Sequence, residues 1–291
     1  MQPTYLIPFD KYYFLLGLSL LTSLKRHVSN LQKIYVLDFG LEAAQVAFLK
    51  EYGVCVAPLP QALVGLDPFA LKANLNMFLR SQDLLGRWLV LLDADMLILK
   101  SPTQAIESVM IQMQQEGQQL ALCQDMGPAT SIAEFIELFR FRNTQFTQYT
   151  APFDLSAPYL NIGFVIFAPE FNFDQYRATA YSMPKEICWV QNAMNLMCLQ
   201  GTQHLLLDPQ QWNLHGRHLL DAFSEKDNPY VLHITSDGDN LVQKCVDLMI
   251  GDHQFTFPYR FTKNSAIDKI QAQVLDTLAK ENSALFLKYL Q

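Results

Sequence analysis

The chain has 291 residues, enough for one large domain or two small ones. Hydrophobic residues make up 50% of the sequence and charged residues 17%, so the composition excludes a disordered, fibrous or low-complexity protein. The formal net charge of -7 has the wrong sign for a protein that binds nucleic-acid phosphates or anionic lipid. We therefore expect no nucleic-acid partner.

The first part of the chain alternates strands and helices. Strands are predicted over 4–8, 33–38 and 54–57, and helices over 12–30 and 41–52. Such alternation favours parallel strands joined by right-handed crossovers, with ligands at the carboxyl ends of the strands.

The apolar segment Phe14–Leu24 is shorter than the roughly 18 residues of a membrane span and has charged flanks. We expect a buried amphipathic helix there, with no signal peptide and no transmembrane segment.

The alternation continues and then becomes less regular. A helix is predicted over 68–85, followed by strands over 87–92 and 119–123 that flank a helix over 101–116. Further strands are predicted over 160–167 and 230–234, and a C-terminal helical segment over 265–291. This order predicts an α/β fold with a mixed sheet flanked by helices. We place residues 1–255 in one α/β domain and residues 256–291 in a C-terminal helical extension.

The cysteines do not form a recognisable motif. Their odd number, wide separation and lack of a Cys-x-x-Cys pair argue against a zinc site and a disulfide framework. We interpret them as small buried residues in a reducing, cytoplasmic location. They are Cys55, Cys123, Cys188, Cys198 and Cys245.

Two acidic residues, Asp93 and Asp95, directly follow the apolar strand over 87–92. In extended backbone, residues i and i+2 point to the same side. Two like charges about 5 Å apart repel by about 3 kcal/mol at an effective dielectric constant near 20, so the pair calls for a cation, a shared proton or water. Apolar neighbours argue against water and favour Mg²⁺ or Mn²⁺. The alternative is a turn in which one aspartate caps a helix.

The segment Trp88–Pro102 resembles the Asp-x-Asp segment of nucleotide-sugar-dependent glycosyltransferases of GT-A fold, especially family 8. An Asp-x-Asp tripeptide often arises by chance, but partial matches to further family motifs occur in the family's order over roughly residues 4–240. These matches are Leu6–Tyr12, Val36–Leu41, Tyr159–Phe167, Gln191–Asn195, Gln211–Asn213 and Val231–His233. The resemblance implies a GT-A, Rossmann-like mixed sheet.

The resemblance also implies a function. It implies a metal-dependent glycosyltransferase that moves a sugar from a nucleotide-sugar donor, expected to be a UDP-sugar, to an unknown acceptor with retention of the anomeric configuration. It implies Mn²⁺ or Mg²⁺ held by Asp93, Asp95 and His233. The residues that it implies for donor binding are Asp10, Lys72, Asp93, Asp125, Asn161 and Gly163. Gln191 and Asn192 would position groups for catalysis.

Each of these residues also has an ordinary structural interpretation. His233 can be a strand-end histidine with satisfied hydrogen bonds, and Lys72 a solvated surface lysine. Asp10 can cap a helix N-terminus. The pattern Asn161–Gly163 can mark a strand bulge, and Asp125 can be a plain loop carboxylate.

The sequence departs from the family pattern at two places. Val190, Gln191 and Asn192 stand where family 8 has Asp-Gln-Asp, so the carboxylate usually discussed as a nucleophile is absent. This disfavours double displacement and favours a front-face reaction in which the leaving phosphate takes the acceptor proton. The lysine expected after His233 is also missing. A phosphate-binding cation would then come from Lys72, Lys244 or Arg217, and we interpret Asp237 and Asp239 as a solvated turn around Gly238.

Two alternatives stay open. The lost motif residues are compatible with a catalytically degenerate protein that binds sugar nucleotides or acts as a scaffold on the same fold. A phosphatase of haloacid-dehalogenase type also uses Asp-x-Asp after a strand, but its motif continues into a polar loop, whereas Asp95 is followed by Met-Leu-Ile-Leu. The segment Tyr149–Tyr159 fits an acceptor-facing loop or an ordinary packed loop. Sugar and acceptor identity cannot be predicted from these residues.

Overall fold

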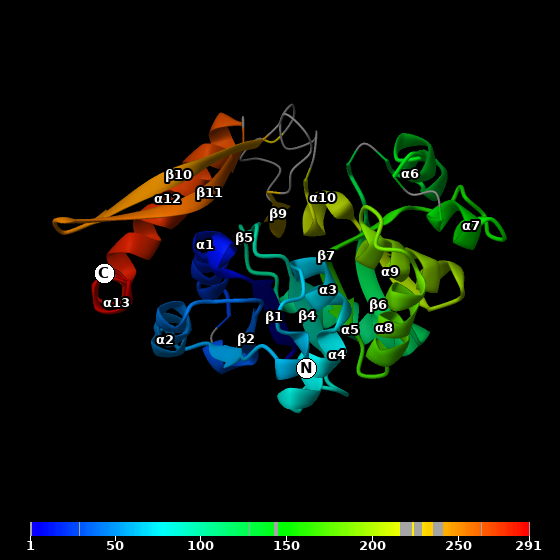
Figure 1. Cartoon of the computed structure of the whole chain (residues 1–291), viewed down its shortest axis with the longest axis horizontal. Helices are drawn as coiled ribbons and strands as arrows, with labels where there is room; N and C mark the ends of the chain where they lie inside the picture. The colour runs from blue at the N-terminus through cyan, green and yellow to red at the C-terminus, as the bar shows by residue number, and fades with distance from the viewer. Residues whose placement is uncertain are drawn as a thin grey trace.

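A computed structural model describes residues 2–28, 30–127, 129–142, 145–215, 223, 229–234, 241–262 and 264–290. Its centre is a seven-stranded sheet in the order β3-β2-β1-β4-β7-β6-β8 (Figure 1). Strand β7 pairs antiparallel with β4 and β6, and the other pairs in this sheet are parallel. The predicted α/β fold with a mixed sheet is confirmed.

The first half of the sheet follows the predicted alternation. The elements are β1 (Thr4–Phe9), η1 (Lys11–Tyr13), α1 (Phe14–Lys25), η2 (Leu31–Lys33), β2 (Ile34–Asp38), α2 (Ala43–Tyr52), β3 (Cys55–Ala57), η3 (Gln61–Leu63) and β4 (Leu89–Leu92). Every residue of β1 and β4 is buried, because the sheet is covered on both faces. The chain winds from β1 to β3 on one side and continues at β4 on the other, so β1 and β4 flank the switch point where α/β sheets bind ligands.

The helix predicted over 68–85 is two helices, α3 (Pro68–Ala73) and α4 (Leu75–Ser81). Asn74 separates them. Its buried side chain donates to the carbonyl of Ala70 at 2.7 Å and accepts from Arg177 Nε at 2.6 Å. A polar side chain that hydrogen-bonds its own backbone competes with the helical ladder, so the helix breaks at this position.

The second half of the chain adds the antiparallel strand β7, its neighbours β6 and β8, and further helices. Its elements are β5 (Met96–Ile98), α5 (Thr103–Glu116), β6 (Leu120–Gln124), α6 (Ile132–Leu138), α7 (Phe146–Thr150), β7 (Leu160–Phe167), α8 (Phe173–Ser182), α9 (Trp189–Leu199), β8 (His204–Leu207), α10 (Pro209–Trp212) and β9 (Val231–His233). Strands β5 and β9 form a separate antiparallel pair. None of the helices within the described ranges has the length and apolar character needed to cross a membrane.

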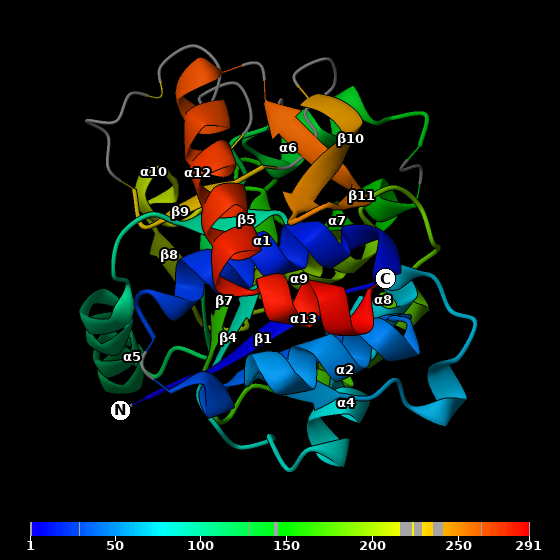
Figure 2. The same ribbon diagram turned by 90° about the vertical axis from the view of Figure 1, so that its left-hand side faces the viewer.

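The C-terminal region packs against the first helices of the fold. It consists of a hairpin, β10 (Leu241–Ile250) and β11 (His253–Thr262), and two helices, α12 (Ser265–Glu281) and α13 (Ser283–Tyr289). The hairpin was not predicted, and the predicted helix over 265–291 is divided at Asn282. Helix α12 packs on α1 and α13 on α2 (Figure 2). The predicted domain boundary at residue 255 stays a prediction; that residue lies within β11.

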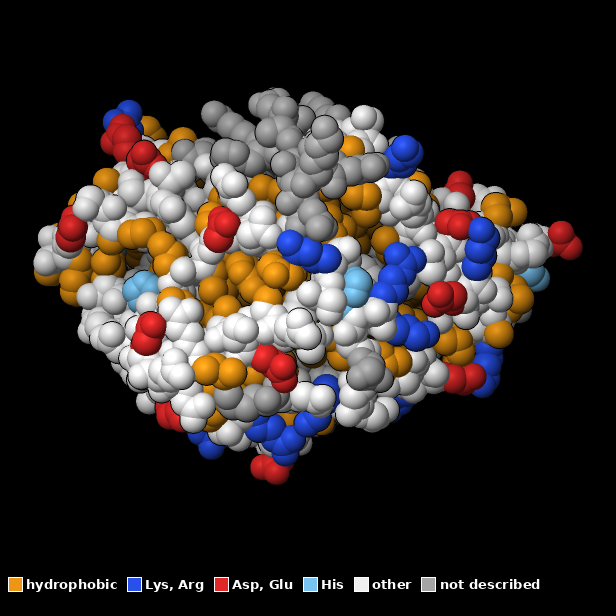
Figure 3. Space-filling model, turned by 180° about the vertical axis from the view of Figure 1, so that it is seen from behind, with side chains coloured by type: hydrophobic (Ala, Val, Ile, Leu, Met, Phe, Trp, Pro, Cys, Tyr) orange, Lys and Arg blue, Asp and Glu red, His pale blue; other side chains and the backbone are white. Residues whose placement is uncertain are grey.

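The surface carries mixed side chains. On the face shown in Figure 3, basic side chains lie interspersed with acidic and apolar ones. All five cysteines are free, and of the five only Cys123 is buried as predicted. Cys55, Cys188 and Cys198 are half-buried, and Cys245 is exposed. The expectation of no nucleic-acid partner stays a prediction.

Candidate metal centre and its polar surroundings

The acidic pair lies in a turn between β4 and β5, at the carboxyl end of β4. The backbone N–H of Asp93 donates to the carbonyl of Gly163 at 2.9 Å, and β5 then pairs with β9 so that Met96 lies opposite His233. Asp93, Asp95 and His233 each offer one ligand atom, and these atoms lie within 4.8 Å of one another. The structure thus brings together the three residues predicted as metal ligands.

A chain of amides fixes the tautomer of His233. Asn161 Nδ2 donates to the Asp125 carboxylate at 3.1 Å, and Asn161 Oδ1 accepts from Asn213 Nδ2 at 2.9 Å. The Asn161 oxygen also accepts from the backbone N–H of Gly163 at 2.8 Å, which sets the orientation of that amide. Asn213 Oδ1 therefore accepts from His233 Nδ1 at 2.8 Å. The lone pair of His233 is left on Nε2, as a metal ligand requires.

Gly163 leaves room for the His233 ring. A Cβ at position 163 would lie 2.5 Å from Cε1 and 2.9 Å from Nδ1 of His233. The pairing of β6 with β7 also shifts between Leu122 and Cys123, opposite this part of β7, so the bulge considered from the sequence is present as well. The strand irregularity considered as the structural alternative is present, and it places a glycine where only hydrogen fits. The donor-binding role predicted for Asn161 and Gly163 stays a prediction.

Each carboxylate of the pair already faces a cation. Lys72 Nζ lies 2.7 Å from Asp93 Oδ1, and Arg260 Nη1 lies 2.9 Å from Asp95 Oδ2. The Lys72 side chain is largely buried, so it does not fit the alternative interpretation as a solvated surface lysine. Arg260 was not predicted, because it comes from β11 and no sequence motif marks it.

The charged neighbours determine the state of Asp95. Burial raises the pKa of Asp95, but the adjacent His233, in its protonated form, and the guanidinium of Arg260 lower it by more, so the pKa lies below its ordinary value. Asp95 Oδ1 is 3.3 Å from His233 Nε2. The carboxyl is therefore ionised at neutral pH and can act as an oxygen ligand.

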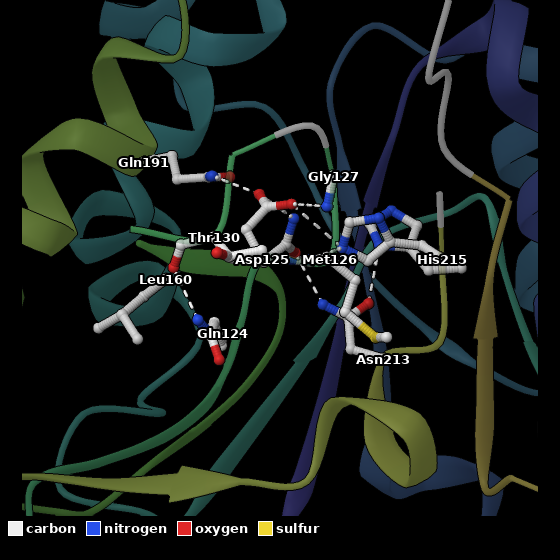
Figure 4. A network of polar contacts seen from close by, with 12 residues as sticks. Gln124, Asp125, Met126, Gly127, Thr130, Leu160, Gln191, Asn213 and His215 are labelled. Carbon is white, nitrogen blue, oxygen red and sulfur yellow. Dashed lines mark hydrogen bonds and ion pairs between the residues drawn. The ribbon is translucent and has the colours of Figure 1, made fainter. Parts of the chain in front are cut away.

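Asp125 is the centre of a group of hydrogen-bonded side chains, here called the Asp125 network, that continues the amide chain beyond Asn161 (Figure 4). Its Oδ2 accepts from Gln191 Nε2 at 2.9 Å, and its Oδ1 accepts from the backbone N–H of Gly127 at 2.8 Å. His215 Nε2 lies 3.3 Å from Oδ1 and accepts from the backbone N–H of Met126 at 3.2 Å. The predicted residues Asp125 and Gln191 thus meet each other. His215 was not predicted, because no sequence motif surrounds it.

Asn192 bonds to Tyr159 and to the turn before α9. Its Oδ1 accepts from the Tyr159 hydroxyl at 2.7 Å, and its Nδ2 donates to the carbonyl of Ile187 at 3.1 Å. The side chain is buried between α9 and the start of β7. These contacts support the packing of α9, and the positioning role predicted for Asn192 stays a prediction.

Asp10 caps a short helix, as its structural alternative anticipated. Its carboxylate accepts from the backbone N–H groups of Tyr12 and Tyr13 at 2.9 and 3.0 Å. It follows β1, the neighbour of β4, and its predicted contact with the donor stays a prediction. Arg217, Asp237, Gly238 and Asp239, and the side chain of Lys244, lie outside the described residues.

The amide chain makes a prediction for Asn213. We expect Asn213→Leu to weaken Mn²⁺ binding about 10- to 100-fold, because His233 loses the acceptor that fixes its tautomer. Isothermal titration calorimetry measures the affinity. As a control, Asn282→Leu removes another buried asparagine, whose amide donates to the Leu278 carbonyl at 3.0 Å, and should leave the affinity unchanged. Unchanged affinity in Asn213→Leu would contradict the assignment.

Comparison with known proteins relates the fold to solved structures of glycosyltransferases. No family model matches the chain, and no curated protein matches it. Among solved structures, the apo bifunctional glycosyltransferase WbbM is similar at 15% identity and TM-score 0.55, over 81% of this chain and 46% of that one. The apo glycosyltransferase GlyE of Streptococcus pneumoniae TIGR4 is similar at 13% identity and TM-score 0.55, over 97% of this chain and 63% of that one.

The galactosyltransferase LgtC, solved with donor and acceptor sugar analogues, has 15% identity and TM-score 0.48, over 79% of this chain and 86% of that one. The chain spans less than two thirds of the WbbM and GlyE chains. The predicted GT-A fold is confirmed by the WbbM and GlyE matches. At these identities the similarity concerns the fold alone.

Proposed function

We propose that the chain is a metal-dependent glycosyltransferase that transfers a sugar from a nucleotide-sugar donor, a UDP-sugar, to an acceptor. The observation that carries the proposal is the cluster of Asp93, Asp95 and His233 at the switch point of a glycosyltransferase fold. Asp95 runs directly into β5 rather than into a polar loop, which argues against the phosphatase alternative. The acceptor is unidentified, and a cytoplasmic location remains part of the proposal.

The residues present fit a divalent ion. The cluster offers two carboxylate oxygens and one imidazole nitrogen, a donor set suited to Mn²⁺ and acceptable to Mg²⁺. His233 is held in the required tautomer by Asn213. A bound ion would supply Lewis-acid stabilisation of the charge that develops on the leaving diphosphate. Lys72, beside Asp93, adds a fixed positive charge at the same position.

We assign the Asp125 network to binding of the transferred sugar. Asp125 accepts hydrogen bonds and Asn161 and Gln191 donate to it, so the three side chains form a preorganised polar surface for sugar hydroxyls. Because Val190 and Asn192 replace the family's two carboxylates, we propose retention by front-face attack. Gln191 would then position Asp125 and the substrates without becoming a nucleophile.

Donor turnover tests the proposal. The protein is incubated with Mn²⁺ and a panel of UDP- and GDP-sugars, and release of nucleoside diphosphate is measured. We expect slow release from one UDP-sugar, since water can replace the acceptor. Tight UDP binding without release or transfer of any sugar would favour the alternative, a catalytically degenerate sugar-nucleotide-binding or scaffolding protein. Hydrolysis of p-nitrophenyl phosphate without nucleotide would favour a phosphatase.

A further inference from the structure

Arg260 reaches the acidic pair from the C-terminal hairpin. Its Nη1 is 2.9 Å from Asp95 Oδ2, its Nη2 donates to the Tyr13 hydroxyl, and its guanidinium carbon lies 4.7 Å from the centre of the Tyr13 ring. Its backbone carbonyl accepts from Gln271 Nε2 of α12 at 2.7 Å. Contacts with Asp95 and Tyr13 hold the guanidinium in place, and α12 holds the backbone of Arg260. The side chain is 18% exposed.

The charges of these side chains balance before any ligand binds. Asp93 and Asp95 contribute two negative charges, and their partners Lys72 and Arg260 contribute two positive ones. A divalent ion added to this set therefore brings an excess of positive charge into a largely buried site. A diphosphate offsets that excess, so ion and diphosphate should bind together more tightly than either alone.

The two oxygens of Asp95 face different partners. Oδ1 faces His233, the side on which a shared ion would bind, whereas Oδ2 faces Arg260. The guanidinium can thus keep its carboxylate contact while the cluster holds an ion. A guanidinium has five N–H donors in a planar fork that matches phosphate oxygens, and the contacts given above use two of its nitrogens. The remaining N–H groups are available to a phosphate bound next to the cluster.

We propose that Arg260 binds the diphosphate of the donor and takes the place of the lysine that the family pattern expects after His233. The C-terminal hairpin would then be part of the donor site. This inference rests on the proposed function. The competing explanation is that Arg260 only stabilises the packing of β11 against the acidic turn, in which case it makes no contact with a ligand.

Calorimetry with Mn²⁺ alone, with UDP in saturating Mn²⁺, and with uridine in saturating Mn²⁺ separates the two explanations. We expect Arg260→Ala to bind Mn²⁺ alone as tightly as the wild type or more tightly, because a competing cation is gone. We expect its affinity for UDP to fall about 10- to 100-fold and its affinity for uridine, which has no phosphate, to stay unchanged. Arg260→Lys keeps the positive charge but not the planar guanidinium group, so it should lose less affinity for UDP than Arg260→Ala.

Lys280→Ala is the matched control, since it removes one positive charge from an exposed pair on α12 with Asp276. It should bind UDP as the wild type does. Wild-type affinity of Arg260→Ala for UDP would overturn the inference, as would an equal loss for UDP and uridine. If Arg260→Ala does not fold, Arg260→Lys and Arg260→Gln are used instead, and their loss of affinity for UDP is compared with their loss of affinity for uridine. Failure of the wild-type protein to bind UDP with Mn²⁺ would instead overturn the proposed function.

Discussion

Asp95→Asn is expected to abolish Mn²⁺-dependent UDP binding and to lower donor turnover by about 10³-fold or more. The substitution keeps the shape of the side chain but removes the charge that faces both His233 and Arg260. Metal-assisted stabilisation of a leaving group contributes several kcal/mol to catalysis, and each 1.36 kcal/mol corresponds to a tenfold change in rate. Calorimetry and the release of nucleoside diphosphate measure the two losses.

Asp174→Asn is the control for this substitution. Asp174 pairs with Arg80 on an exposed surface of α8, so the same chemical change there should leave nucleotide binding unaffected. Circular dichroism should show that both variants keep the wild-type secondary structure. If Asp95→Asn bound UDP in a Mn²⁺-dependent manner with wild-type affinity, the assignment of Asp95 as a metal ligand would be wrong.

Gly163→Ala is expected to destabilise the protein by about 1–3 kcal/mol and to weaken metal binding. The added methyl group would lie 2.5 Å from Cε1 of His233 and 2.9 Å from Cε of Met96. The methionine end can move, but the imidazole is buried and bonded to Asn213, so the ring is displaced from Asp95. Urea denaturation measures the stability change, and Mn²⁺ titration measures the loss of affinity.

A double-mutant cycle isolates the contact that this prediction depends on. In a His233→Ala background the ring is absent, so the further cost of Gly163→Ala should be much smaller than in the wild type. An equal cost in both backgrounds would show that another contact, such as that with Met96, rather than the His233 ring, explains the requirement for glycine.

The sequence predicted those features that depend on local pattern. The alternation of apolar runs with helical spacing gave the order of β1 to β4, and the buried run before Asp93 placed the acidic pair at the end of a central strand. His233 was found because its strand carries a recognisable motif in the expected order. Strand β9 pairs with β5 one residue past the acidic pair, which explains why this distant histidine meets the two aspartates.

The features that the sequence did not reveal depend on contacts between distant segments. Arg260 lies 165 residues after its partner Asp95, and it arrives on a hairpin whose strands have no motif of their own. His215 becomes part of the site only because the chain after α10 lies against Asp125. The Asn74 side chain at the break between α3 and α4 likewise has a distant partner, Arg177 of α8. Local propensity carries no information about such partners.

The most direct test of the account is anomalous diffraction at the manganese edge from crystals soaked with MnCl₂ and UDP. We expect one peak within about 2.5 Å of an oxygen of Asp93, an oxygen of Asp95 and Nε2 of His233, with the diphosphate on the open side of the ion. Density for UDP with no manganese peak at these three residues, or a peak elsewhere in the protein, would contradict it.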